Sequence, residues 1–133
     1  MMAAVSELRR RVRGKKVAAT GFCFGGGIVW RLLAAGEARV AAAAPFYGPF
    51  PDGGDLRRAR AAVLAIYGGL DARVGATRPA AQAAMRSAGL DNRVVVFGGA
   101  DHASFNDTGP RFNAPAAAEA YRRVLDWFGR NAA

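Results

Sequence analysis

Short apolar runs alternate with longer alanine-rich segments along this chain, and the alternation predicts strands separated by helices. Four runs have the length and apolar character of buried strands, and they span residues 15–22, 38–48, 61–71 and 92–102. The last of these runs is rich in β-branched residues, which favour strands. Because the runs are apolar along most of their length, we expect a parallel sheet that is covered on both faces.

Four other segments are predicted to form helices, at residues 3–13, 24–36, 78–89 and 114–131. The third has a proline near its start and a glycine at its end, which is the usual asymmetry of helix termini. The fourth is amphipathic, and five of its apolar residues can share one face: Ala117, Tyr121, Val124, Leu125 and Phe128. The predicted fold class is therefore α/β, with about four parallel strands flanked by helices.

The length of 133 residues suits a single domain, 1–133, and the 52% of apolar residues argues against disorder. No apolar run approaches the roughly 20 residues of a membrane-spanning helix, so we expect no membrane span. The first fifteen residues lack the apolar region of a secretory signal. The single cysteine excludes a disulfide framework and indicates a reducing compartment, so we expect a cytoplasmic location.

The formal net charge of +9 raises the question of nucleic-acid binding. Two basic stretches stand out, RRRVRGKK at 9–16 and RRAR at 57–60. Aromatic residues do not interleave with either stretch, and no known nucleic-acid module surrounds them. We interpret both stretches as solvated helix faces and loops, and nucleic acid is not the expected partner.

The only cysteine of the chain lies in the segment TGFCFGGG, residues 20–27, between a predicted strand and a predicted helix. Gly21, Cys23 and Gly25 match the G-x-nucleophile-x-G elbow, with cysteine in the position of the usual serine. Such a turn strains the nucleophile's backbone and projects its side chain above the sheet, and it needs small neighbours two residues away. The backbone N–H of Phe24 would then be one donor of an oxyanion hole.

Three other interpretations of this turn compete with the elbow. A buried apolar cysteine beside a glycine-rich turn is common, and a phosphate-binding loop is a second alternative. The dinucleotide fingerprint G-x-G-x-x-G fails because Cys23 stands at its second glycine, and the G-K-[ST] of a P-loop is missing. Redox sensing by Cys23 lacks a resolving cysteine in this chain.

Two further polar residues follow predicted strands, which is where open α/β sheets place their chemistry. His102, the only histidine, follows the apolar stretch VVVFGGA at the end of the run 92–102 and is a candidate general base. Asp71 ends the strand at 61–71 and is a candidate for the acid that orients the histidine, although it could be a turn residue or helix cap. Asp101 is a poorer candidate, because adjacent residues of an extended chain point in different directions. Cys23, Asp71 and His102 have the chain order of an α/β-hydrolase triad.

The sequence resembles the dienelactone hydrolase family, the Cys-Asp-His branch of the α/β-hydrolases. The resemblance rests on GFCFGGG at 21–27, IYGGLDARV at 66–74, GADHASFND at 99–107, and a closing helix that contains Trp127 and Phe128. It implies hydrolysis of a small-molecule ester or lactone through a thioester formed on Cys23. His102 would transfer the proton and Asp71 would orient His102. No cofactor and no metal ion is expected.

The resemblance covers only the C-terminal half of the family fold, so the domain 1–133 is expected to lack its first four strands. In the family that missing half supplies the second oxyanion donor and a glutamate that gates the thiol. An arginine that holds the substrate carboxylate follows the family histidine, whereas Asn106 lies in that neighbourhood here. The strand before Cys23 would then be an exposed edge, for which a homo-oligomer or a complementing N-terminal half is the expected partner. The alternative function is an inactive or fragmentary hydrolase-like domain that binds an acidic partner or nucleic acid.

Overall fold

Four strands pair in the order in which they occur in the chain, and every pair is parallel. The computed structural model describes all residues from Met1 to Ala133. The strands are β1 (Val17–Phe22), β2 (Val40–Phe46), β3 (Ala62–Gly68) and β4 (Asn92–Phe97). The predicted α/β class with four parallel strands is confirmed, although β3 and β4 end several residues earlier than the apolar runs suggested.

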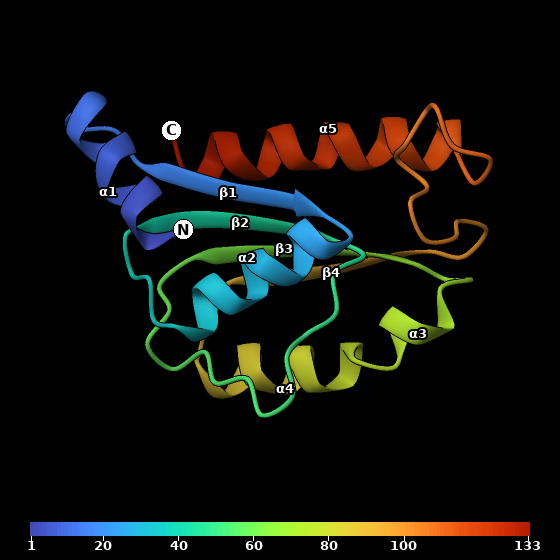
Figure 1. Cartoon of the computed structure of the whole chain (residues 1–133), viewed down its shortest axis with the longest axis horizontal. Helices are drawn as coiled ribbons and strands as arrows, with labels where there is room; N and C mark the ends of the chain where they lie inside the picture. Colours follow the sequence, from blue (N-terminus) through green and yellow to red (C-terminus); the bar gives the residue numbers. More distant parts are fainter.

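Helices cover both faces of this sheet (Figure 1). α2 (Phe24–Ala34) and α4 (Arg78–Ser87) lie on one face, and α5 (Ala114–Asn131) lies on the other. α1 (Met2–Arg11) precedes β1, and the short α3 (Ala72–Gly75), which the sequence pattern did not predict, follows β3. The carboxyl ends of the strands point toward the end of the molecule that holds α3 (Figure 1).

The central strand β3 is buried on both faces, which explains its continuous apolar sequence. Successive side chains of a strand point to opposite faces, so its residues divide between two clusters. Val63, Ala65 and Tyr67 join a cluster of 17 buried residues under α2 and α4. Leu64 and Ile66 join a cluster of 10 buried residues under α5.

The buried face of α5 differs from the predicted one. Tyr121 and Leu125, which were expected in the core, are 57% and 54% exposed. The indole of Trp127 is buried instead, and its Nε1–H donates a hydrogen bond to the Ala62 carbonyl at 3.1 Å. The buried residues of the helix are Ala116, Ala120, Val124 and Trp127.

α1 is linked to the loop before β2 by Arg39, which forms an ion pair with the buried Glu37 carboxylate. The Glu37 side chain is 2% exposed and accepts a hydrogen bond at 2.6 Å from Arg39 Nε. The same guanidinium donates to Ser6 Oγ at 2.7 Å and to the Met2 carbonyl at 3.3 Å. The pair therefore links the loop before β2 to the first two turns of the first helix.

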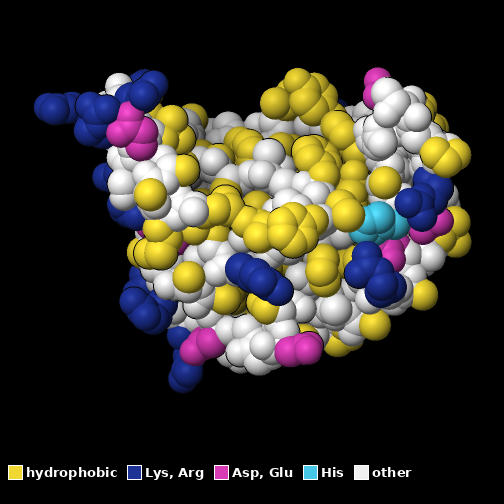
Figure 2. Space-filling view, in the orientation of Figure 1, with side chains coloured by type: hydrophobic (Ala, Val, Ile, Leu, Met, Phe, Trp, Pro, Cys, Tyr) yellow, Lys and Arg dark blue, Asp and Glu magenta, His cyan; other side chains and the backbone are white.

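Basic side chains are prominent on the surface of the molecule. Lys and Arg side chains gather at the end where α1 lies, and others lie beside the only histidine at the opposite end (Figure 2). Many of the nearby basic residues line one hollow of about 370 Å³ beside α1 and β2: Arg9, Lys15, Lys16, Arg39 and Arg60. None of the helices combines the length and the apolar character that a bilayer-spanning segment requires.

Candidate active site

Cys23 lies on a tight turn between β1 and α2, at the N-cap position of that helix. Its backbone has φ 56° and ψ −118°, a combination that residues other than glycine rarely adopt. The Cys23 N–H donates to the Phe46 carbonyl at 3.1 Å, which ties the turn to the end of β2. The thiol itself is exposed at the carboxyl end of the sheet.

Only one of the two glycines that flank Cys23 is required by the space around it. A Cβ atom on Gly21 would lie 2.4 Å from the carbonyl oxygen of Gly25, so that position cannot hold a side chain. A Cβ atom on Gly25 would meet nothing within 4 Å outside its own helix, which corrects the expectation that both positions need glycine.

A second pair of glycines, which sequence reasoning missed, holds the turn against the end of β2. A Cβ atom on Gly48 would lie 2.2 Å from the carbonyl carbon of Gly26, and one on Gly26 would lie 2.5 Å from the Phe46 carbonyl oxygen. The backbones of α2 and of the loop after β2 are therefore in direct contact. The only available signal was the glycine that follows PFY in the sequence, because the contact joins segments that are distant along the chain.

His102 lies in a turn that follows β4 rather than on the strand itself. Its Nε2 is 2.9 Å from the Cys23 Sγ, and its Nδ1 is 2.6 Å from Asp71 Oδ2. The side chains of His102 and Asp71 are 13% and 6% exposed, so the contact between them is shielded from water. The structure thus brings together three residues that are separated by up to 79 positions in the sequence.

Asp71 serves as a helix cap as well as a partner of the histidine. It is the N-cap of α3, where its Oδ1 accepts the Val74 N–H at 3.1 Å. The other oxygen is the one that contacts His102. Asp101 does not compete for the ring, because its Oδ1 accepts the backbone N–H of His102 instead.

A pocket of about 370 Å³ opens beside the cysteine. Its wall contains three aromatic rings, one amide and no charged side chain: Phe22, Cys23, Tyr47, Ala103, Phe105 and Asn106. Burial raises the pKa of the Tyr47 phenol, a hydrogen bond donated by the Phe105 backbone N–H lowers it, and the nearby Cys23 raises it further. The Tyr47 hydroxyl therefore stays protonated at neutral pH. The chain has no cluster of three or more His, Cys, Asp or Glu residues arranged to hold a metal ion.

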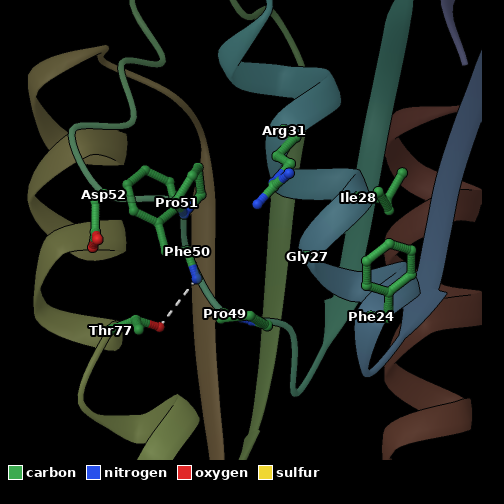
Figure 3. Close-up of a pocket in the computed structure, with 9 residues that line it drawn as sticks. All are labelled: Phe24, Gly27, Ile28, Arg31, Pro49, Phe50, Pro51, Asp52 and Thr77. Carbon is green, nitrogen blue, oxygen red and sulfur yellow. Dashed lines mark hydrogen bonds between the residues drawn. The ribbon is translucent and has the colours of Figure 1, made fainter.

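Phe24, the first residue of α2, presents its backbone and its side chain to different spaces. Its N–H has no acceptor within the helix, as is general for a first helical residue, and is available to a ligand. Its ring is 76% exposed and lines a second hollow of about 270 Å³. In that hollow Arg31 of α2 points toward the loop 49–52, and Thr77 Oγ1 accepts the Phe50 N–H (Figure 3).

The dienelactone hydrolase family model matches residues 1–132 of the chain. A protein of Yersinia pestis named "Putative carboxymethylenebutenolidase" is 35% identical over 125 residues, which are 86% of this chain and 46% of the relative. A protein with the same name from Saccharolobus solfataricus is 32% identical over 117 residues, covering 87% of this chain and 45% of the relative. The chain therefore spans about half the length of the curated relatives it matches.

Solved structures show the same relationship. A dienelactone hydrolase-like promiscuous phosphotriesterase from metagenomic libraries superposes with a TM-score of 0.83 at 29% identity, over 98% of this chain and 59% of that one. A dienelactone hydrolase from Anabaena variabilis gives a TM-score of 0.77 at 22% identity, over 99% of this chain and 58% of that one. The second likeness supports the fold alone.

Proposed function

Because the chain belongs to the dienelactone hydrolase family, we propose that it carries the nucleophile, base and acid of a hydrolase for small-molecule esters or lactones. Cys23 is the nucleophile, His102 the general base and acid, and Asp71 the group that orients His102. One observation carries the proposal. The thiol, the imidazole and the carboxylate form a continuous line of contacts at 2.9 Å and 2.6 Å, at the carboxyl end of the sheet.

In the first half of the proposed reaction, His102 Nε2 takes the thiol proton of Cys23 and the sulfur attacks the carbonyl carbon of the ester. The electron pair of the carbonyl moves to its oxygen, which accepts the N–H of Phe24 at the positive end of α2. Collapse of this tetrahedral species breaks the ester C–O bond and leaves a thioester on Cys23. The departing alkoxide takes the proton from His102 and leaves as an alcohol.

In the second half, His102 accepts a proton from a water molecule, whose oxygen attacks the thioester. The C–S bond breaks, the acid product leaves, and the proton returns to the sulfur. Asp71 remains ionised throughout and stabilises the imidazolium that forms in each half. These steps use only groups of this chain and water, so the proposal needs no cofactor.

We also propose that in the active protein a further strand lies against the outer edge of β1. That strand has a neighbour on one side only, and Phe22 at its end is 41% exposed. Unpaired strand edges bind other strands. We propose that in the active protein a strand of the family fold that this chain does not contain pairs there, which is consistent with the greater length of the solved relatives.

Turnover of p-nitrophenyl acetate by the wild type and by Cys23→Ala tests the proposed function. We expect release of p-nitrophenol by the wild type, with a thioester on Cys23 that mass spectrometry detects after acid quenching. The Cys23→Ala variant should form no acyl adduct and should turn over no faster than buffer. Equal rates for the two proteins would remove the catalytic role of Cys23.

A further inference from the structure

The three residues other than glycine that have positive φ all line the same pocket. They are Cys23, Tyr47 and Ala103, with φ values of 56°, 34° and 64°. Positive φ is unfavourable for residues other than glycine. Such a backbone conformation persists only where the surrounding structure imposes it, and it is found most often at functional sites. Their convergence on one pocket indicates that the site fixes all three.

Two of these backbone conformations are accounted for by the site already described. The conformation of Cys23 forms the turn that presents the thiol, and that of Ala103 immediately follows His102 in the turn that presents the imidazole. Tyr47 is neither a member of the contact chain nor a neighbour of one in the sequence. Its strained backbone therefore needs a separate explanation.

The Tyr47 side chain packs on the ring of His102. The centroids of the two rings are 5.1 Å apart at an angle of 58°, and Tyr47 is only 3% exposed. The N–H of Tyr47 donates to the Ile66 carbonyl at 2.8 Å, which fixes its backbone to β3, the strand that leads to Asp71. The tyrosine ring thus contacts both the ring of Phe46 on β2 and the imidazole.

We propose that Tyr47 is a positioning residue that keeps the His102 imidazole in line with the Cys23 thiol, an inference that rests on the proposed function. The contacts to Asp71 and Cys23 hold the two ring nitrogens but leave the imidazole free to tilt about the axis that joins them. A ring packed at 5.1 Å blocks that tilt from one side. The face of an aromatic ring also stabilises a positive charge, which the imidazole acquires in each half-reaction.

The rate at which iodoacetamide alkylates Cys23 reports this positioning, because the chain has no other cysteine and the measurement does not depend on turnover. Rates are measured from pH 5 to pH 9 for the wild type, His102→Ala, Tyr47→Phe, Tyr47→Leu and Phe50→Leu. The last variant is the matched control, since Phe50 is 4% exposed and packs on Trp30, in the cluster on the other face of the sheet. Circular dichroism checks that each variant is folded, and Tyr47→Met replaces Tyr47→Leu if the latter is not.

We expect Tyr47→Leu to lose at least about tenfold in alkylation rate at pH 7 and to acquire the rate–pH profile of His102→Ala, because small displacements of a reacting group cost orders of magnitude. Tyr47→Phe, which keeps the ring, and Phe50→Leu should both follow the wild-type profile. An unchanged rate in Tyr47→Leu alone overturns the role of Tyr47, as does an equal loss in Tyr47→Phe or in Phe50→Leu. An unchanged rate in His102→Ala overturns the pairing of Cys23 with His102, and the role of Tyr47 with it.

Discussion

Asp71 holds the His102 ring with one carboxylate oxygen while its other oxygen caps α3. The first contact is 2.6 Å long and the second, to the Val74 N–H, is 3.1 Å long. A residue that looks like an ordinary turn aspartate in the sequence is therefore also the partner of the only histidine. Both oxygens have a partner, so no replacement side chain can satisfy both contacts without a second acceptor.

The Asp71→Asn variant should keep its fold and lose activity. An amide has one acceptor oxygen, and its NH2 group favours the wrong tautomer of the imidazole when it faces Nδ1. We expect ester hydrolysis to fall by about 10²–10⁴, measured as p-nitrophenyl acetate turnover. Asp101→Asn is the matched control, because the amide oxygen can still accept the backbone N–H of His102. A comparable loss in Asp101→Asn would contradict the assignment of Asp71.

Gly48→Ala should destabilise the fold strongly. The added Cβ would lie 2.2 Å from the Gly26 carbonyl carbon and 2.3 Å from the Gly27 nitrogen, and backbone atoms cannot move aside as side chains do. We expect the free energy of unfolding in urea to fall by about 3 kcal/mol or more. Gly129→Ala is the control with the opposite expectation. Its Cβ would meet nothing within 4 Å in the last turn of α5, so we expect a gain of at most about 0.5–1 kcal/mol.

Glu37→Gln should cost stability at neutral pH and much less in acid. The hydrogen bond from Arg39 holds the pKa of the Glu37 carboxyl below its usual value in the folded chain. A carboxyl group with a lowered folded pKa stabilises the fold above its unfolded pKa, and that contribution fades as the pH falls through the folded pKa. We therefore expect a loss of about 1–2 kcal/mol at pH 7 that shrinks below about pH 4, measured by urea unfolding at each pH.

Glu119→Gln is the control for the Glu37 prediction. The Glu119 side chain is 34% exposed and its partners Arg122 and Arg123 are more exposed still, so the expected loss of stability at pH 7 is smaller than that of Glu37→Gln. A cost for Glu37→Gln that is the same at pH 7 and pH 3 would show that the charge of the carboxylate contributes nothing.

The isolated chain should associate with itself, because the outer edge of β1 has no strand beside it. We expect sedimentation equilibrium to give a mass above 13.9 kDa that rises with protein concentration. A lysine on an edge strand opposes such pairing, so Thr20→Lys on β1 should shift the protein toward the monomer. Thr108→Lys adds the same charge to an exposed loop and should leave association unchanged. A monomer at every concentration would contradict the expectation.

The sequence predicted the strands well wherever a continuous apolar run is followed by glycines that end it. The run AAVLAIYGG is apolar on both faces and ends in two glycines, so its strand and the polar residue after it could be predicted without the structure. α3 could not be predicted, because its four residues are too few for any helical period. The sequence pattern did not identify which face of α5 packs on the sheet, because apolar residues occupy two neighbouring faces of this helix. The hydrogen bond from Trp127 to Ala62, which accompanies the buried face, joins residues that are far apart in the sequence.

The sequence singles out the three polar residues of the candidate site, but it does not indicate the residues that pack around them. Cys23, Asp71 and His102 could be singled out because each is a chemically distinctive residue that follows an apolar run. The packing of Tyr47 on His102 joins residues 55 positions apart, and nothing in the segment PFYG marks its tyrosine as strained. Interactions of that kind depend on how strands and loops meet in space, which residue spacing does not specify.

The contact between Gly26 and Gly48 also limits how this sequence can change over time. Each glycine faces backbone, so a mutation at either position meets atoms that no second mutation can shorten. A second substitution could not compensate for a larger residue at either position, as it can where two side chains touch. We therefore expect these two positions to be among the slowest to drift, even in descendants that have exchanged the cysteine for another nucleophile.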